Sequence, residues 1–229
     1  MIINWLSDNF IEIFGAVTGI LYVVLEIRQN ILLWPIGIIT SGVYIWVFFT
    51  GKFYADMSLQ GYYLAISILG WYWWMRGRNG HAGRANERRG EGVNGRREEN
   101  RNYYLETGDE KKEEEKELKV TRVRLKTALI LSAVFTGLYF SLWFVLDRFT
   151  DSPVPVGDSF ITSLSIIATW MLARKIYEHW YLWIVVNASS VALFLIKGLY
   201  PTVILYVVYC GMSFAGLVAW KRSLNYNST

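Results

Sequence analysis

Charged side chains are missing from long stretches of this sequence, and that absence is its most restrictive feature. The 229 residues also include a single cysteine, four prolines and two histidines. The lone cysteine, Cys210, allows neither an internal disulfide nor a cysteine-based metal site. What is abundant is apolar: 53% of the residues are hydrophobic and 17% are aromatic. Long uncharged runs of such residues cannot form a surface covered by water, so the composition predicts an integral membrane protein.

Seven uncharged runs have about the length needed to cross the hydrocarbon core of a membrane. A helix rises about 1.5 Å per residue and needs roughly 17 to 25 residues to cross, and only helices and closed barrels keep every backbone group hydrogen-bonded there. The predicted spans are residues 10–26, 32–49, 54–75, 125–146, 160–173, 180–196 and 201–220. The fifth span is the shortest, and residues 154–157 could extend it. We predict an all-α integral membrane protein of seven transmembrane helices.

Basic residues are distributed unevenly around these spans. Because seven spans place the two chain ends on opposite sides, every connection can be assigned to one side or the other. One side receives 20 of the 23 lysines and arginines, and the other receives only Lys52, Arg148 and Lys197. Loops rich in lysine and arginine stay in the cytoplasm. We therefore expect the N-terminus outside and the C-terminus in the cytoplasm.

The connection between the third and fourth spans has a composition of its own. Residues 77–102 are mostly Gly, Arg, Asn and Glu, which is typical of a flexible segment. From about Tyr103 onward the pattern changes, and the mixed charges of residues 110–117 at helical spacing predict a helix that continues into the fourth span. We interpret the insert as a solvated cytoplasmic linker, and a regulatory or partner-binding role is the alternative.

Two of the spans resemble each other. When residues 54–76 are aligned with residues 200–222, an offset of 146, seven of 23 positions are identical, against about two expected by chance in a search for repeats. The matched pairs are Tyr54/Tyr200, Leu59/Leu205, Tyr63/Tyr209, Ser67/Ser213, Gly70/Gly216, Trp74/Trp220 and Arg76/Arg222. The match predicts a duplicated three-helix unit, with the fourth helix returning the chain so that both copies are parallel.

This duplication predicts a 3+1+3 arrangement around a central path. Residues 1–76 form the first three-helix repeat and residues 77–119 form the charged cytoplasmic insert. Residues 120–150 contain the inverting fourth helix, and residues 151–229 contain the second repeat and the C-terminus.

Polar side chains share one helical face in several of these spans, at spacings of three and four residues. The candidate binding residues are Thr40, Ser41, Tyr44, Gln60, Tyr63, Trp180, Trp183, Asn187, Ser190 and Tyr209. An amide that faces lipid is costly, so Asn187 and Gln60 must face protein or a cavity. Simple attachment of one helix to another is the alternative for both amides. For Trp180, close to basic residues, the alternative is a place in the interfacial aromatic belt.

The groups that catalysis or ion coupling needs are absent from the centres of the spans. The acidic and histidine residues nearest to spans, or in their connections, are Glu12, Glu26, Asp158, His81 and His179. No nucleophile with a base and no paired metal ligands are present there, so we expect neither an enzyme nor a cofactor. The last span has no lysine before Lys221 that could hold retinal. Without a buried carboxylate a passive carrier is favoured, and a seven-helix sensor is the alternative.

A cavity lined by Trp, Tyr, Asn and Gln suits a flat polar ligand. Indole faces stack on aromatic rings and attract cations, whereas amides and hydroxyls pair with amide or sugar groups. Neutral walls of this kind bind a ligand without retaining it, as a carrier requires.

Two groups of residues carry a family resemblance that covers nearly all of the chain outside the insert. The first half contributes Tyr54-Ala55-Asp56 with Gln60 and Gly70-Trp71-Tyr72-Trp73-Trp74, and the second contributes Arg174-Lys175 with Glu178, Trp180, Trp183 and Asn187. With this combination the chain resembles the PnuC family of bacterial vitamin transporters, whose best known members carry nicotinamide riboside.

The resemblance implies a homotrimer of SWEET-like 3+1+3 fold in the bacterial inner membrane. It also implies uptake of nicotinamide riboside by facilitated diffusion, with phosphorylation in the cytoplasm trapping the product for NAD biosynthesis. On the family pattern, Trp183 and Asn187 would hold the nicotinamide ring and its carboxamide. Gln60, Tyr63 and Thr40 would meet the ribose or the opposite edge of the ligand. The long insert, and Thr40 where some relatives carry Asn, depart from that pattern. Carriers of thiamine or riboflavin share the fold and are the alternatives.

Overall fold

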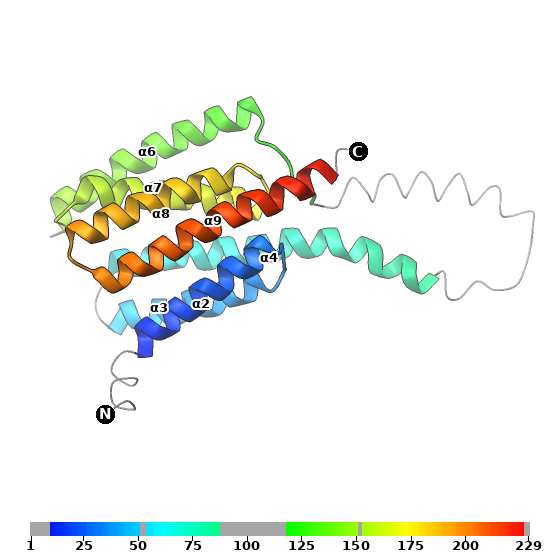
Figure 1. The fold of residues 1–229 in the computed structure, drawn as a ribbon, viewed down its shortest axis with the longest axis horizontal. Coiled ribbons are helices and arrows are strands. Elements are labelled where there is room, and N and C mark those ends of the chain that lie inside the picture. The colour runs from blue at the N-terminus through cyan, green and yellow to red at the C-terminus, as the bar shows by residue number, and fades with distance from the viewer. Residues whose placement is uncertain (1–9, 51–53, 88–117, 151–152, 227–229) are drawn as a thin grey trace, which may run out of the picture.

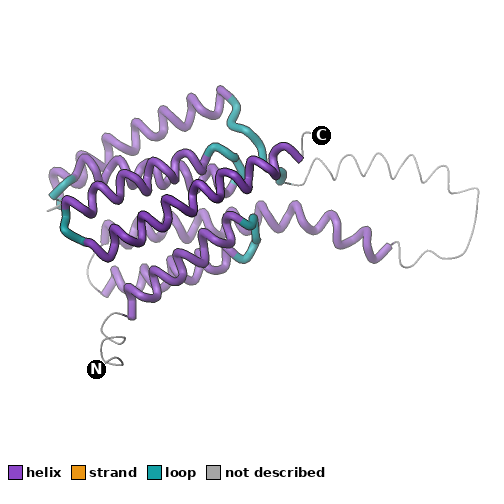
Figure 2. Tube along the Cα trace, viewed as in Figure 1, coloured by secondary structure: helices purple, strands orange, loops and turns teal. Residues whose placement is uncertain are grey.

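The chain folds into a bundle of long helices. The computed structural model describes residues 10–50, 54–87, 118–150 and 153–226. Its helices are α2 (Phe10–Ile27), α3 (Leu33–Thr50), α4 (Tyr54–Glu87), α6 (Leu125–Phe149), α7 (Pro155–Ala173), α8 (His179–Ile196) and α9 (Tyr200–Tyr226). Figure 1 shows how they lie beside one another, and Figure 2 shows helix and loop but no strand in the described residues. The predicted all-α class is confirmed.

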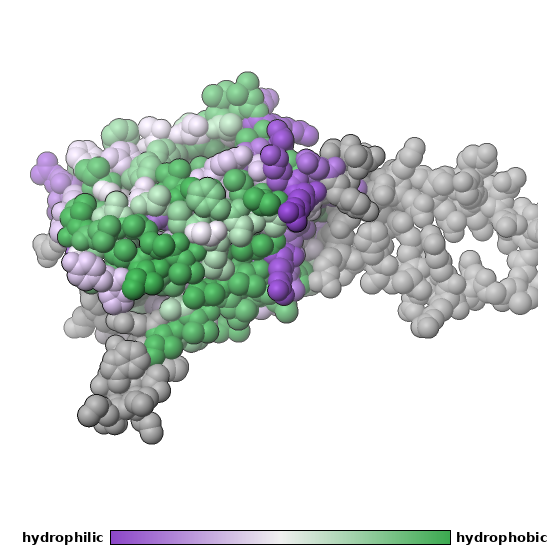
Figure 3. All heavy atoms as spheres, in the orientation of Figure 1, coloured by the Kyte–Doolittle hydropathy of each residue, from purple (hydrophilic) through white to green (hydrophobic). Residues whose placement is uncertain are grey.

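Five of these helices are long and apolar enough to cross a membrane. They are α3, α6, α7, α8 and the Tyr200–Asn225 part of α9. α2 contributes a shorter apolar segment, Ile13–Ile27, and α4 contains the predicted third span within its 34 residues. In Figure 3 apolar side chains cover the middle of the face formed by α2, α8 and α9, and hydrophilic ones gather toward the end of α9. Such a surface suits contact with lipid tails, which are as apolar as leucine.

Several helices extend past the predicted spans; α6 ends at Phe149 rather than at residue 146, and α9 ends at Tyr226 rather than at residue 220. α7 begins at Pro155 rather than at residue 160, which agrees with the expectation that residues 154–157 could extend the fifth span. Proline is well suited to the first position of a helix, where its missing N–H is not needed. α4 continues to Glu87, so the prediction of a flexible segment is wrong for residues 77–87. A helix that extends an existing span needs no new nucleus, and this offsets the unfavourable glycines. Residues 88–117, with the helix predicted from Tyr103, lie outside the described residues.

The segment directly before α6 is extended, so the prediction that a helix runs without a break into the fourth span is wrong. Thr121 pairs with the connection between α7 and α8: its N–H donates to the Lys175 carbonyl at 3.0 Å, and its carbonyl accepts from the Tyr177 N–H at 2.9 Å. The Val123 N–H donates to the Glu178 carboxylate at 2.8 Å. These partners satisfy the backbone of the segment outside a helix.

Equivalent contacts recur at the offset of 146 found in the sequence. The indole ring of Trp34 in α3 presses against Gly70 in α4, and the ring of Trp180 in α8 presses against Gly216 in α9. At either glycine an added Cβ would clash with the ring. The two glycines are a matched pair of the sequence alignment, and the two tryptophans are separated by the same offset. Both helix pairs therefore pack in the same way.

We call α2, α3 and α4 the first set of helices and α7, α8 and α9 the second set. The two sets contact each other at two equivalent places. α2 packs against α9, and α4 packs against α7. At the ends of these contacts Trp74 Nε1 donates to the Ala173 carbonyl at 3.3 Å, and Trp220 Nε1 donates to the Glu26 carbonyl at 3.0 Å. Each bond runs from the third helix of one set to the end of the first helix of the other. α6 lies outside both sets, against α7 (Figure 1).

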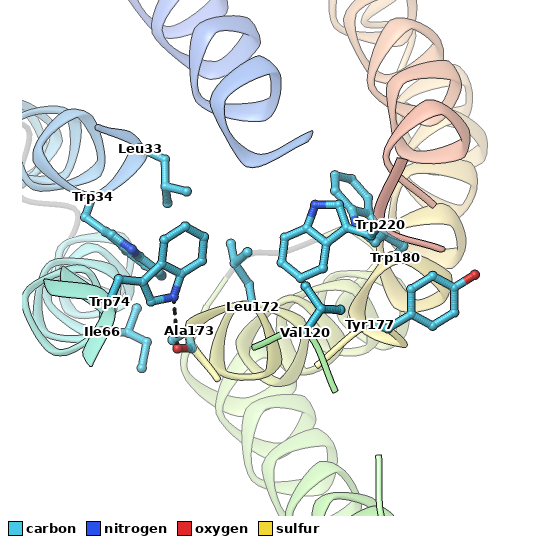
Figure 4. Packing of buried hydrophobic residues seen from close by; sticks show 10 residues of the cluster. All are labelled: Leu33, Trp34, Ile66, Trp74, Val120, Leu172, Ala173, Tyr177, Trp180 and Trp220. Atoms are coloured by element: carbon cyan, nitrogen blue, oxygen red, sulfur yellow. Dashed lines mark hydrogen bonds between the residues drawn. The ribbon is translucent and has the colours of Figure 1, made fainter. Parts of the chain in front are cut away.

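The largest group of buried apolar side chains lies at one end of the bundle. Figure 4 shows Trp34 and Trp74 of the first set on one side of this cluster and Trp180 and Trp220 of the second on the other. The cluster residues are Leu33, Trp34, Ile66, Trp74, Val120, Leu172, Ala173, Tyr177, Trp180 and Trp220. We call this the aromatic layer. By the distribution of basic residues it lies at the end predicted to face the cytoplasm.

Candidate functional site

Asn187 is the polar residue whose placement is best defined. It is only 5% exposed in α8, and its Nδ2 donates to Ser213 Oγ of α9 at 3.0 Å. Ser213 Oγ itself donates to the Tyr209 carbonyl at 2.8 Å, so toward Asn187 it must accept. This fixes the orientation of the amide, because Nδ2 faces Ser213 and the carbonyl oxygen faces away from it. The Asn187 carbonyl is thereby positioned to accept a hydrogen bond from a ligand.

Several buried polar atoms have no hydrogen-bond partner within the described residues. They are the indole Nε1 of Trp34, Trp180 and Trp183 and the hydroxyl oxygens of Thr40, Ser163 and Ser190. Buried polar groups in native proteins are nearly always hydrogen-bonded, so these atoms are candidates for hydrogen bonds to water or to a bound polar molecule. Trp183 and Ser190 lie four residues before and three residues after Asn187 in α8, on the same face of the helix. Four of the six residues, Thr40, Trp180, Trp183 and Ser190, are among the predicted binding residues.

Tyrosine side chains lie where the two sets of helices meet, near the face of α8 that carries Trp183, Asn187 and Ser190. Tyr63 of α4 lies near Ser165 of α7 and Tyr206 of α9. Tyr209 lies near Tyr44 of α3, and its ring centroid is 5.7 Å from that of Tyr206. The hydroxyls of Tyr44 and Tyr209 both press against glycines of α2. The predicted residues Tyr44, Tyr63 and Tyr209 thus lie where helices from both sets meet.

The remaining predicted binding residues are Ser41, Gln60 and Trp180. Ser41 of α3 is buried, and Gln60 is half-buried on the same face of α4 as Tyr63, one turn closer to the start of the helix. Trp180 is 1% exposed and belongs to the aromatic layer, with its ring against Gly216 and 6.0 Å from the ring of Trp220. Packing explains the position of Trp180, whereas its contact with a ligand stays a prediction.

Two residues with unpaired buried atoms were missed by sequence reasoning. Trp34 carried a usable signal, because it lies 146 positions before Trp180 although outside the aligned segments. Ser163 carried none. A serine in an apolar helix usually bonds its own backbone, as Ser165 does to the Ile161 carbonyl at 2.8 Å. The sequence does not show that Ser163 lacks such a bond.

Glu26 and His179, expected near a span end and in a connection, do lie at helix ends, but they are buried there and contact each other. His179 is the first residue of α8 and is fully buried, and Glu26 near the end of α2 is 2% exposed. His179 Nε2 and Glu26 Oε1 lie 3.1 Å apart. The two residues are 153 positions apart in the chain, so no local pattern reveals their contact. By contrast, Asp158 lies near the start of α7 and is partly exposed in an ion pair with Lys197.

Comparisons with known proteins agree with the resemblance predicted from the residues. A family model described as nicotinamide mononucleotide transporter matches residues 9–222. The nicotinamide riboside transporter PnuC of Escherichia coli is 24% identical over 94% of this chain and 86% of its own length. PnuC of Neisseria mucosa is 23% identical over 96% and 75%, respectively. The riboflavin/roseoflavin transporter RibM of Streptomyces davaonensis is 22% identical over 95% and 92%.

A solved structure shares the fold. The crystal structure of the vitamin B3 transporter PnuC matches with a TM-score of 0.65 at 21% identity, covering 98% of this chain and 86% of that chain. All of these proteins are transporters rather than enzymes.

Proposed function

Because the chain belongs to the nicotinamide mononucleotide transporter family, we propose that this multi-pass membrane protein carries nicotinamide riboside into the bacterial cytoplasm. Relatives named as transporters of that riboside match nearly the whole chain. The structural observation that carries the proposal is the buried, oriented amide of Asn187 on one face of α8 with the unpaired Trp183 and Ser190.

The chemistry of the riboside fits these groups. Its pyridinium ring is flat and cationic, so it can stack on the electron-rich indole of Trp183. Its carboxamide N–H can donate to the Asn187 carbonyl, which faces away from Ser213. For the ribose hydroxyls we propose Thr40, Gln60 and Tyr63 as partners, with Ser190 nearby. This assignment supplies a partner for the Thr40 hydroxyl, which has none within the described residues.

A neutral site favours the riboside over the mononucleotide. A phosphate dianion is usually held by arginine, lysine or helix N-termini, and the centres of the predicted spans contain no basic residue. Among the basic groups at the helix ends, Lys197 pairs with Asp158 at 3.0 Å. Arg174 and Lys175 lie over tryptophan rings, 5.0 and 4.5 Å from the centroids. We therefore expect the phosphate-free nucleoside to be the substrate.

The transport mode that we propose is facilitated diffusion, with the product trapped by phosphorylation in the cytoplasm. No acidic residue lies at the centre of a predicted span to bind a coupling ion. We further propose an N-terminus outside, a C-terminus in the cytoplasm and a homotrimer in the inner membrane. The two three-helix repeats, residues 1–76 and 151–229, would move relative to each other around the site. The reciprocal bonds of Trp74 and Trp220 support this division.

A second candidate is riboflavin transport, because a riboflavin carrier is nearly as similar to the chain as the riboside carriers are. Calorimetric titration of the purified protein with nicotinamide riboside, its mononucleotide, thiamine and riboflavin separates these functions. We expect binding of the riboside and much weaker binding of the others. Tight binding of thiamine or riboflavin, with none of the riboside, would overturn the proposal.

A further inference from the structure

Residues 118–123, which lead into α6, belong to neither set of helices, and we call them the strap. Val120 of the strap is only 4% exposed and is part of the aromatic layer, and Leu118 packs against the same layer. Figure 4 shows the side chain of Val120 with those of Trp180 and Trp220 in this cluster. A segment outside both sets of helices therefore helps to bury the end of the bundle that is predicted to face the cytoplasm.

The strap is hydrogen-bonded to the connection between α7 and α8. The Thr121 N–H donates to the Lys175 carbonyl at 3.0 Å, and the Tyr177 N–H donates to the Thr121 carbonyl at 2.9 Å. Further along the strap, the Val123 N–H donates to the Glu178 carboxylate at 2.8 Å. Lys175 has a φ of 51°, a conformation that is usually taken by glycine at the end of a helix. The strap therefore stabilises a turn that its own sequence does not favour.

The connection that the strap holds also contacts the first set of helices. Arg174 lies over the ring of Trp73 and Lys175 over the ring of Trp74, at 5.0 and 4.5 Å from the ring centroids. Just before the connection, the Ala173 carbonyl accepts from Trp74 Nε1 at 3.3 Å. Cation–π contacts and hydrogen bonds weaken steeply when distance or direction changes. These contacts between the two sets therefore form only while the connection keeps its position.

We propose that the strap keeps the inner end of the transport path closed by holding the connection between α7 and α8 against α4. The four tryptophans of the aromatic layer are at most 4% exposed, so a carried molecule passes this end only when the two sets separate there. Separation breaks the contacts of Arg174 and Lys175 with the tryptophan rings of α4. The open form lacks these contacts, so its stability does not depend on the conformation of the connection, whereas the stability of the closed form does.

Thr121→Pro removes the donor of one strap bond, because proline has no N–H, and Thr121→Ser is the matched control that keeps it. Both variants also carry Cys210→Ser, which removes the only cysteine, and Leu172→Cys as a reporter. Leu172 is 0% exposed within the aromatic layer, so a maleimide reaches a thiol there only when the layer opens. When opening is fast relative to labelling, the labelling rate of the purified protein follows the open fraction. We expect roughly two- to tenfold faster labelling in Thr121→Pro than in Thr121→Ser, the effect of one backbone hydrogen bond.

Two variants of Glu178 test the other attachment of the strap. Glu178→Ala removes the acceptor for the Val123 N–H, whereas Glu178→Gln keeps an oxygen that can accept. We expect faster labelling at position 172 in the alanine variant and nearly unchanged labelling in the glutamine variant. A second reporter, Ser159→Cys in place of Leu172→Cys, separates local opening from unfolding, because Ser159 is also 0% exposed but lies near the other end of α7. Its labelling rate should be the same in all strap variants.

This inference rests on the proposed transport function, because a carrier has to open at its inner end, but the labelling needs no substrate. If labelling follows these expectations and no riboside enters liposomes that contain the wild-type protein, the proposed substrate is wrong and the role of the strap stands. Equal labelling at position 172 in Thr121→Pro and Thr121→Ser would overturn that role. Equal acceleration at positions 172 and 159 would also overturn it, since the strap would then support the fold as a whole rather than the closed end.

Discussion

Asn187 combines a structural contact with a proposed role in binding the substrate. Its Nδ2 is used in the bond to Ser213, and the bond from Ser213 to the Tyr209 carbonyl leaves the amide only one orientation. The carbonyl oxygen therefore offers an acceptor whose position is fixed before a ligand arrives. Such preorganisation reduces the entropy lost when a ligand binds.

Replacing Asn187 with alanine should weaken riboside binding by more than about 1 kcal/mol, because the carboxamide of the ligand would lose a buried partner. Titration calorimetry of the purified variant measures the change. Asn30→Ala is the matched control, since the same side chain lies exposed in the turn between α2 and α3, where it accepts from the Leu32 N–H at 2.9 Å. That variant should keep the wild-type affinity. Equal affinities for all three proteins would contradict the role of Asn187.

Residue chemistry allowed part of the site to be predicted. Asn187, Thr40 and Ser190 stand out because polar groups are rare and costly in apolar spans, and all three are buried or half-buried in the structure. Glu26 and His179 did not stand out, because each lies at a span boundary where a charge is ordinary. Only the packing of α2 beside α8 and α9 shows that the two meet away from water.

At the scale of helices, packing depends on two glycines that admit indole rings. Gly216 in α9 receives the edge of Trp180, and Gly70 in α4 receives the edge of Trp34. Without a hydrophobic driving force between helices in lipid, close approach at small residues is a main source of helix association. The sequence alignment predicted that the glycines correspond but not which side chains they receive.

Gly216→Ala should destabilise the protein by about 1–3 kcal/mol, the usual range for an overpacked core, because the new methyl group would clash with the Trp180 ring. Thermal unfolding in detergent, followed as the midpoint temperature, measures the loss. Gly211→Ala is the control in the same helix, since nothing lies within 4 Å of an added Cβ there. A variant at Gly216 as stable as the one at Gly211 would show that the ring can move aside.

The positions of helices could be predicted where a long apolar run defines them. They could be predicted less well where contacts with distant parts of the chain determine the local structure. The predicted span of residues 180–196 matches α8 to within one residue, because an uncharged run in lipid must be helical. The segment around Thr121 was predicted to be helical from its surroundings in the sequence. It pairs instead with Lys175 and Tyr177, and these partners come from far along the chain.

At the scale of the whole molecule, two reciprocal hydrogen bonds connect the two sets of helices. Trp220 Nε1 donates to the Glu26 carbonyl and Trp74 Nε1 to the Ala173 carbonyl. Within the part of the chain that the structure describes, Trp180 and Trp34 of the same aromatic layer have no partner for Nε1. All four rings are at most 4% exposed. The layer therefore contains tryptophans that donate across the molecule beside tryptophans whose Nε1 makes no hydrogen bond to the described residues, and the two kinds can be compared directly.

Trp220→Phe should lower the stability of the closed protein by about 1 kcal/mol more than Trp180→Phe does, because both changes shorten a buried ring and only the first removes a hydrogen bond. Trp74→Phe compared with Trp34→Phe should show the same difference in the other set. The midpoint of thermal unfolding without ligand measures all four. If the variants of each pair melt together, the two indole hydrogen bonds across the molecule contribute nothing net, and the stability lost in each variant comes from the packing of its ring.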